Sequence, residues 1–238
     1  RLIQILSGHK ADVLTVTWVE DGKKLVSSSD DGTVKYWDFA SGKLISELFI
    51  SNTELDAIAV DSDLKIYLGT DGGEIIILNF SEREHIRAHE SGIKRLALSS
   101  DQSTLLSQSY DQTCKLWSVK PSLVCRHKVE LPDSIWPRSA AFLGENKLVF
   151  GTFGCTYGTY DIPSQNWQLD QSVDNLGINA VADYKGHVYT IGDAGVLRRD
   201  KESIARLSGP GNFLIEYRGR LLSGGHNGRL FDVISGEI

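Results

Sequence analysis

A ten-residue stretch of this chain occurs twice, 80 residues apart, and this repeat constrains the fold more than any single motif does. The first copy, residues 29–38, reads SDDGTVKYWD, and the second, residues 109–118, reads SYDQTCKLWS. A short polar segment with a histidine, His9 or His89, precedes each copy. A repeat over this distance indicates an array of one supersecondary unit.

Positions that match the end of the first copy recur along the whole chain at intervals of 32 to 43 residues. Six units are visible, ending at Trp37-Asp38, Leu78-Asn79, Trp117-Ser118, Tyr160-Asp161, Arg199-Asp200 and Phe231-Asp232. Alternation of apolar and polar residues predicts four strands in the first unit, over residues 13–19, 24–29, 33–38 and 43–50. Four strands in about 40 residues are typical of a propeller blade. We therefore predict an all-β propeller with six visible blades, each a four-stranded antiparallel sheet.

The two ends of the chain leave the number of blades in the parent protein open. Residues 2–6 stand where a fourth strand would stand, and residues 235–238 match the entry into such a strand. Either the first strand completes the last blade of a six-bladed ring, or a seventh blade lies outside this sequence. We expect residues 1–238 to form one propeller domain, or most of one, cut from a longer chain.

Composition excludes several classes of protein. The net charge is −6 and the pI is about 5.5, so the chain lacks the basic character of most nucleic-acid binders. The longest apolar run, residues 75–78, is far too short to span a bilayer. Cys114, Cys125 and Cys155 form no CxxC pair, and their odd number disfavours a disulfide framework. We expect an intracellular protein, cytoplasmic or nuclear.

At the repeated residues, the chain resembles the WD-repeat (WD40) β-propeller family. The resemblance covers essentially all 238 residues and is sharpest in the first and third units. In that family, a buried hydrogen-bond set joins a loop histidine to a second-strand serine or threonine, a turn aspartate and a third-strand tryptophan. The resemblance implies two such sets here: His9, Ser29, Asp31 and Trp37, and His89, Ser109, Asp111 and Trp117. It also implies a platform for partners within a larger assembly, without naming a pathway.

No reaction signature accompanies this scaffold. The sequence contains no HExxH, P-loop, GxSxG or dinucleotide-binding motif. His85 and His89 are four residues apart, which suits a shared metal only on a helix. We expect no catalytic residue, no metal and no cofactor. An enzyme or ligand-binding propeller that uses a central channel stays open as an alternative, although the expected channel positions lack a carboxylate cluster: Leu14, Thr15, Lys94, Arg95, Arg138, Ser139 and Asn179.

Loop residues that differ between the copies are the candidates for binding protein or peptide partners. Loops carry recognition more often than the scaffold does, and Trp, Tyr and Arg dominate interface hot spots. The candidate residues are Tyr110, Trp136, Arg138, Phe153 and Lys94. Trp136 has a competing interpretation, as a cap over the gap between two blades. Contact with RNA through Lys94, Arg95 and Arg138 is a further alternative, which the net acidity disfavours.

Overall fold

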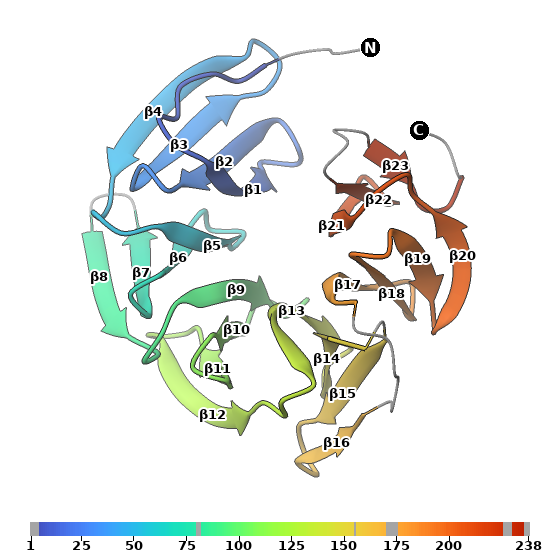
Figure 1. The fold of residues 1–238 in the computed structure, drawn as a ribbon. Helices are drawn as coiled ribbons and strands as arrows, with labels where there is room; N and C mark the ends of the chain where they lie inside the picture. Colours follow the sequence, from blue (N-terminus) through green and yellow to red (C-terminus); the bar gives the residue numbers. More distant parts are fainter. Residues whose placement is uncertain (1–4, 80–81, 155, 170–175, 226–229, 236–238) are drawn as a thin grey trace. The chain divides into compact units, whose positions relative to one another are not determined.

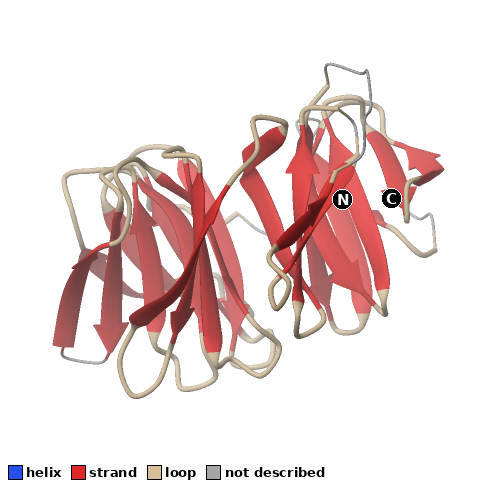
Figure 2. Cartoon of the chain, turned by 90° about the horizontal axis from the view of Figure 1, so that it is seen from below, coloured by secondary structure: helices blue, strands red, loops and turns tan. Residues whose placement is uncertain are grey.

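The computed structural model describes residues 5–79, 82–154, 156–169, 176–225 and 230–235. Every regular element in these ranges is a β-strand, and turns and loops make up the remainder (Figure 2). Within the same ranges no helix is long and apolar enough to cross a membrane. The all-β class predicted from the repeat is confirmed.

The chain divides into two compact units, of which the first spans Arg1–Val129. It contains three four-stranded antiparallel sheets, each built in chain order (Figure 1). The strands are β1 (Val13–Val19), β2 (Lys24–Ser29), β3 (Thr33–Asp38), β4 (Lys43–Phe49), β5 (Leu55–Val60), β6 (Ile66–Thr70), β7 (Glu74–Asn79), β8 (Glu82–Arg87), β9 (Ile93–Leu98), β10 (Thr104–Ser109), β11 (Thr113–Ser118) and β12 (Val124–Glu130). The first strand of each sheet packs against the first strand of the next, β1 on β5 and β5 on β9.

The second unit, Glu130–Ile238, repeats this plan. Two four-stranded sheets are followed by a sheet with three described strands. The strands are β13 (Ile135–Leu143), β14 (Lys147–Thr152), β15 (Tyr157–Asp161), β16 (Asn166–Gln168), β17 (Ile178–Tyr184), β18 (His187–Gly192), β19 (Val196–Arg199), β20 (Glu202–Arg206), β21 (Gly211–Tyr217), β22 (Arg220–Gly225) and β23 (Leu230–Asp232). A fourth strand of the last sheet would begin near residue 235, and residues 236–238 lie outside the described residues.

The six blades predicted from the repeat are therefore present in the described residues. In the first unit of the repeat, the bounds of three strands are confirmed and the fourth ends at Phe49 instead of residue 50. Asp21 and Gly22 both have positive φ in the turn between β1 and β2, as an Asp-Gly hairpin requires. Residues 226–229, which join β22 to β23, lie outside the described part of the chain.

The run Ile75-Ile76-Ile77-Leu78 shows why a blade needs a neighbour on each face. Ile75 and Ile77 are buried in the core shared with the third sheet, whereas Ile76 and Leu78 are buried in the core shared with the first sheet. A strand that is covered on both faces reads as a continuous apolar run, because successive side chains point to opposite faces. Each of these side chains contributes about 1.5–3 kcal/mol by burial. Inter-sheet packing is thus the main stabilising force in this unit.

A β-bulge near the start of the first strand recurs in all six described sheets. In the first sheet the register shifts between Val13 and Thr15, and in the fifth between Ile178 and Ala180. A bulge bends its strand and re-aims the neighbouring side chains. The loop that enters each blade is therefore turned in the same local way, and this places the loop histidines of the first and third sheets.

Gly32 and Gly144 provide a test of how tightly the turns are held. Both have a positive φ, but a Cβ on Gly32 would lie 1.8 Å from the Ser51 carbonyl oxygen, whereas a Cβ on Gly144 would meet nothing within 4 Å. Alanine costs about 1–2 kcal/mol in a left-handed conformation. We expect Gly144→Ala to lower the free energy of unfolding by about that amount and Gly32→Ala to lower it clearly further, as measured by urea unfolding. Equal losses would contradict the contact at Ser51.

Candidate functional site

A hydrogen-bonded chain of four side chains ties the loop before β1 to the first sheet. The Trp37 indole N–H lies 2.9 Å from Ser27 Oγ, and Ser27 Oγ lies 2.7 Å from His9 Nε2. His9 Nδ1 lies 3.0 Å from an Asp31 carboxylate oxygen, which also accepts the Lys10 backbone N–H. The loop and the turn between β2 and β3 are thus held together through the sheet.

The third sheet contains the same series of hydrogen bonds, with almost the same distances. Trp117 Nε1 lies 2.8 Å from Ser107 Oγ, which lies 2.7 Å from His89 Nε2, and His89 Nδ1 lies 3.0 Å from Asp111. His89 is 1% exposed and Ser107 is fully buried. Buried polar groups of this kind need partners, and here each donor finds an acceptor. We name these two sets the blade networks.

The prediction that Ser29 and Ser109 belong to the blade networks was wrong. Ser29 Oγ instead accepts the Asp31 backbone N–H, and Ser109 Oγ accepts the Asp111 backbone N–H. The register explains the difference: Trp37 lies opposite Leu25, so the indole reaches diagonally to a residue two places along the strand. Ser29 lies about 7 Å further along the strand, next to the turn.

The charges of the blade networks fix the direction of each hydrogen bond. Burial lowers the pKa of His89, although the Asp111 charge opposes this effect, and the imidazole is therefore neutral. An ionised carboxylate only accepts, so His89 Nδ1 carries the proton and Nε2 accepts the Ser107 hydroxyl. The indole N–H of Trp117 then donates to the serine oxygen.

Hydrogen bonding outweighs burial at both network aspartates. Burial by itself would raise the pKa of Asp31, but hydrogen bonds from Thr33, the Lys10 backbone and His9 hold it far below its ordinary value. Burial likewise opposes the shift at Asp111, where bonds from Thr113, the Glu90 backbone and His89 lower the pKa. Both carboxylates are therefore ionised acceptors throughout the neutral range.

Ser107, His89 and Asp111 are connected in the order of a catalytic Ser-His-Asp triad. Nevertheless, the serine hydroxyl is fully buried, and its oxygen already accepts the Trp117 indole N–H. A nucleophile needs an exposed oxygen and room for a substrate carbonyl. The geometry of this set therefore suits a structural clamp between loop and sheet.

The fifth and sixth sheets keep the hydroxyl of the blade network without its partners. In the first sheet, Ser27 pairs with Val16, three residues after the first strand begins. At the same position, Thr190 pairs with Val181 in the fifth sheet, and Ser223 pairs with Leu214 in the sixth. The Thr190 and Ser223 hydroxyls are buried and have no hydrogen-bond partner among the described residues. Arg198 pairs with Thr190 as Lys35 pairs with Ser27. It therefore stands at the position of the buried lysine of the repeat.

In the first unit, the structure places two of the candidate binding residues together. Lys94 Nζ lies 4.9 Å from the centre of the Tyr110 ring. The same ammonium contacts Asp56 at 2.5 Å and Asp71 at 2.6 Å, and only 8% of the Lys94 side chain is exposed. Lys94 is therefore largely engaged inside the unit, and Tyr110, which is half-buried, keeps part of its ring accessible.

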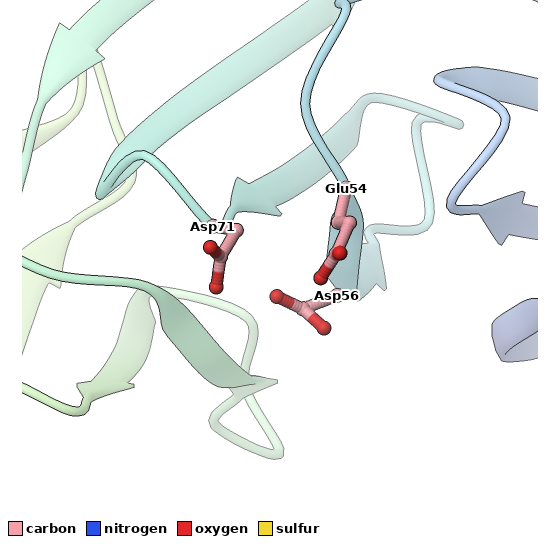
Figure 3. Close-up of side chains that lie close together, drawn as sticks. All are labelled: Glu54, Asp56 and Asp71. Atoms are coloured by element: carbon pink, nitrogen blue, oxygen red, sulfur yellow. The ribbon is translucent and has the colours of Figure 1, made fainter.

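Three carboxylates lie close together next to that lysine, an arrangement that sequence patterns did not reveal. Figure 3 shows the three side chains. Oxygens of Glu54, Asp56 and Asp71 lie within 4.8 Å of one another. The charges of Asp30 and then Asp56 raise the pKa of Glu54. Asp71 follows β6 and Asp56 lies on β5, so only folding brings them together. Because the Lys94 ammonium contacts two of the three, this cluster has its own counterion.

In the second unit, the structure brings the other three candidates together. The rings of Trp136 and Phe153 meet edge to face with centres 4.7 Å apart, and the Arg138 guanidinium lies 5.8 Å from the centre of the Trp136 ring. Phe153 is 41% exposed, Arg138 is exposed and Trp136 is half-buried. The Phe153 backbone N–H donates to the Ser134 carbonyl, which fixes the turn against the loop before β13. We name Trp136, Arg138 and Phe153 the aromatic patch.

The remaining candidates from the sequence belong to separate local contacts. His85 lies 3.6 Å from Glu74 on the exposed face of β8, whereas His89 is buried in the blade network. Burial raises the pKa of the Cys114 thiol, and Cys125 is exposed. Cys155 lies outside the described residues. Sequence spacing therefore suggested one histidine pair, but the fold assigns its members to different surroundings.

Comparison with known proteins supplies the family. The family model for the WD domain, G-beta repeat, matches residues 1–38 and 80–118, which contain the histidine, aspartate and tryptophan of both blade networks. These two segments match the WD-repeat family. This agrees with the four-stranded blades and confirms the resemblance found in the repeat.

Relatives of this WD-repeat chain come from several kinds of protein. It is 30% identical over 118 residues to the transcriptional corepressor LEUNIG_HOMOLOG of Arabidopsis thaliana, which covers 48% of the chain and 15% of the relative. It is 29% identical over 119 residues to U3 small nucleolar RNA-associated protein 12 of Saccharomyces cerevisiae, with 48% and 12% covered. It is 27% identical over 136 residues to a guanine nucleotide-binding protein subunit beta of Oryza sativa subsp. indica, with 50% and 35% covered. The matches thus span about an eighth to a third of each relative.

Ser27 and Thr190 test the energetic value of the blade network. Ser27→Ala would leave a buried indole N–H and an imidazole nitrogen without partners, and we expect a loss of about 2 kcal/mol in unfolding free energy. Thr190→Val removes a buried hydroxyl that has no partner among the described residues, so we expect a change within about 0.5 kcal/mol or a small gain. Urea unfolding of both variants measures this difference. A larger loss for Thr190→Val would contradict the assigned network.

The lowered pKa values of Asp31 and Asp111 predict that the free energy of unfolding falls at acid pH, and we call this fall the acid limb. A carboxyl whose pKa is lower in the folded state stabilises the fold above its unfolded pKa of about 4, and this contribution disappears as the pH falls toward the folded pKa. We expect the double variant D31N/D111N to be less stable at pH 7 and to lose less stability between about pH 4 and 2. Urea unfolding at each pH measures both effects.

The exposed turn residue Asp21 provides the matched control for this experiment. It carries the same charge on the same unit but lies outside the blade network. Asp21→Asn should keep the acid limb of the wild type, and a flattened limb in this control would contradict the assignment to Asp31 and Asp111.

Proposed function

We propose that this WD-repeat chain is a non-catalytic scaffold that binds protein or peptide partners through its loops within a larger complex. The observation that supports the proposal most is the aromatic patch of the second unit. An exposed Phe153, a half-buried Trp136 and an exposed Arg138 stand together on loops and strand starts of a rigid blade. Residues of these types bring large contact areas with a polar handle and are enriched at interface hot spots.

In this proposal, the blade networks hold the loops in place and the loop residues contact the partner. Where the networks are complete, the loops are fastened to the sheets, so binding to a neighbouring loop residue such as Tyr110 costs little ordering entropy. Trp136 is half-buried, which fits both a role as an anchor for a partner and a role as a cap between blades. In either role, its edge-to-face contact supports the exposed Phe153 ring. The aromatic patch is therefore the main proposed contact, and Tyr110 is a second one on the first unit.

The names of the relatives agree with a scaffold role. One relative is named as a transcriptional corepressor, one as associated with a small nucleolar RNA and one as a subunit of a guanine nucleotide-binding protein. These names share no reaction, and what the three relatives share is sequence similarity to this chain. We extend the proposal to an intracellular location, in the cytoplasm or the nucleus, and to membership of a larger assembly. Contact with RNA through Lys94 is disfavoured, because two carboxylates already neutralise this lysine.

Alanine substitution of the aromatic patch tests the proposal. We expect the triple variant W136A/R138A/F153A to lose most of the partners that the wild-type chain captures from its source cells, because hot-spot residues each contribute about 2 kcal/mol or more. Affinity capture followed by quantitative mass spectrometry measures the loss, and a separate Tyr110→Ala variant shows whether the first unit contributes. Thermal unfolding verifies that each variant is folded.

Tyr217 and Arg218 provide a matched control in the same unit. The Arg218 guanidinium lies 5.2 Å from the centre of the Tyr217 ring, so the pair has the chemistry of the aromatic patch. It lies at the end of β21 and in the turn that follows. Y217A/R218A should retain the partners. Unchanged capture by the triple variant, or equal loss in the control, would exclude the aromatic patch as the contact.

A further inference from the structure

A small cleft opens in the first unit, away from the residues assigned to partner binding above. It lies between the second sheet and the segment that joins β11 to β12, and its volume is about 230 Å³. Pockets for drug-sized ligands and cofactors usually measure about 300–1,000 Å³. The cleft is therefore better matched to one side chain than to a cofactor.

The floor of the cleft is apolar and buried. Tyr67, Ile77, Val119 and Leu123 line it, and each is between 1% and 8% exposed. The Tyr67 hydroxyl donates to the buried Asp61 carboxylate at 3.3 Å, so its polar end is satisfied within the protein. The floor offers contact for hydrocarbon and requires no hydrogen bond from a ligand.

Two carboxylates stand on one wall of the cleft. Glu82 and Glu84 lie two residues apart on β8 and pair with Asn79 and Ile77 of β7, so they point to the same face of the sheet. Both are exposed, and neither forms an ion pair within the described residues. Like charges about 7 Å apart on one strand face repel each other, and a cation between them would relieve this repulsion.

We propose that this cleft binds a lysine or arginine side chain of a protein partner, presented on an extended segment. The aliphatic stem would cover the floor formed by Ile77, Val119 and Leu123, and the cationic end would lie between Glu82 and Glu84. Long basic side chains combine an apolar stem with a charged end in just this way. Lys65 also lines the cleft and leaves a net charge of −1 among the three charged lining residues, so one added cation completes the balance.

Three small probes test this proposal by methyl-detected NMR on the 238-residue chain. N-acetyl-lysine N-methylamide and its arginine analogue supply the stem and the cation, and N-acetyl-norleucine N-methylamide supplies the stem alone. We expect the charged probes to give saturable shifts at the methyls of Ile77, Val119 and Leu123, with millimolar affinity. The norleucine probe should bind about fivefold more weakly, since exposed ion pairs contribute little each. Raising the salt from about 20 to about 300 mM should remove most of this advantage.

Two variants locate the binding. E82Q/E84Q should reduce the affinity for the lysine probe to that for norleucine, and Ser122→Trp should fill the cleft and abolish shifts from all three probes. Glu145→Gln, an exposed carboxyl of the second unit, removes one charge elsewhere and should leave binding unchanged. Equal binding of norleucine and lysine would overturn the basic partner. Shifts outside the cleft, or none at about 20 mM probe, would overturn the site. Neither result bears on the aromatic patch, which is tested separately.

Discussion

The second sheet of this protein buries apolar side chains on both of its faces, so it is stable only between its two neighbours. The run from Ile75 to Leu78 shows this requirement within four residues, because alternate members enter two different cores. Burial on both faces fixes the register of each strand, since a slip of one residue would exchange the two sets. The turns, the bulges and the loop positions all follow from that register.

The blade networks add precision to a scaffold that apolar packing already holds. In the first and third sheets, His9 and His89 join the entering loop to the tryptophan and the turn aspartate through one serine hydroxyl. The fifth and sixth sheets keep a buried hydroxyl without partners among the described residues, and packing evidently tolerates this. A blade of this chain can therefore lack the network and still keep its sheet.

The surfaces proposed for binding differ in chemistry. The aromatic patch offers exposed rings with a guanidinium nearby, whereas the cleft beside β8 offers an apolar floor and two carboxylates. Lys94 shows how folding changes the availability of a charge: the sequence predicts a cation on the rim, and Asp56 and Asp71 form ion pairs with it in the folded chain. Figure 3 shows these two carboxylates beside Glu54. Because opposite charges attract strongly where water is partly excluded, the fold decides which ionic groups remain for a partner.

The repeat by itself determined the all-β class, the six units and most strand bounds of the first unit, because strand alternation and turn chemistry are local properties. The resemblance to the WD-repeat family added the histidine, aspartate and tryptophan positions. The tertiary structure alone decided that Ser27 and Ser107, and not Ser29 and Ser109, complete the networks. It alone assembled the carboxylates around Lys94 and the floor of the cleft. These depend on register and on packing between sheets, which set the reach of each side chain across the fold.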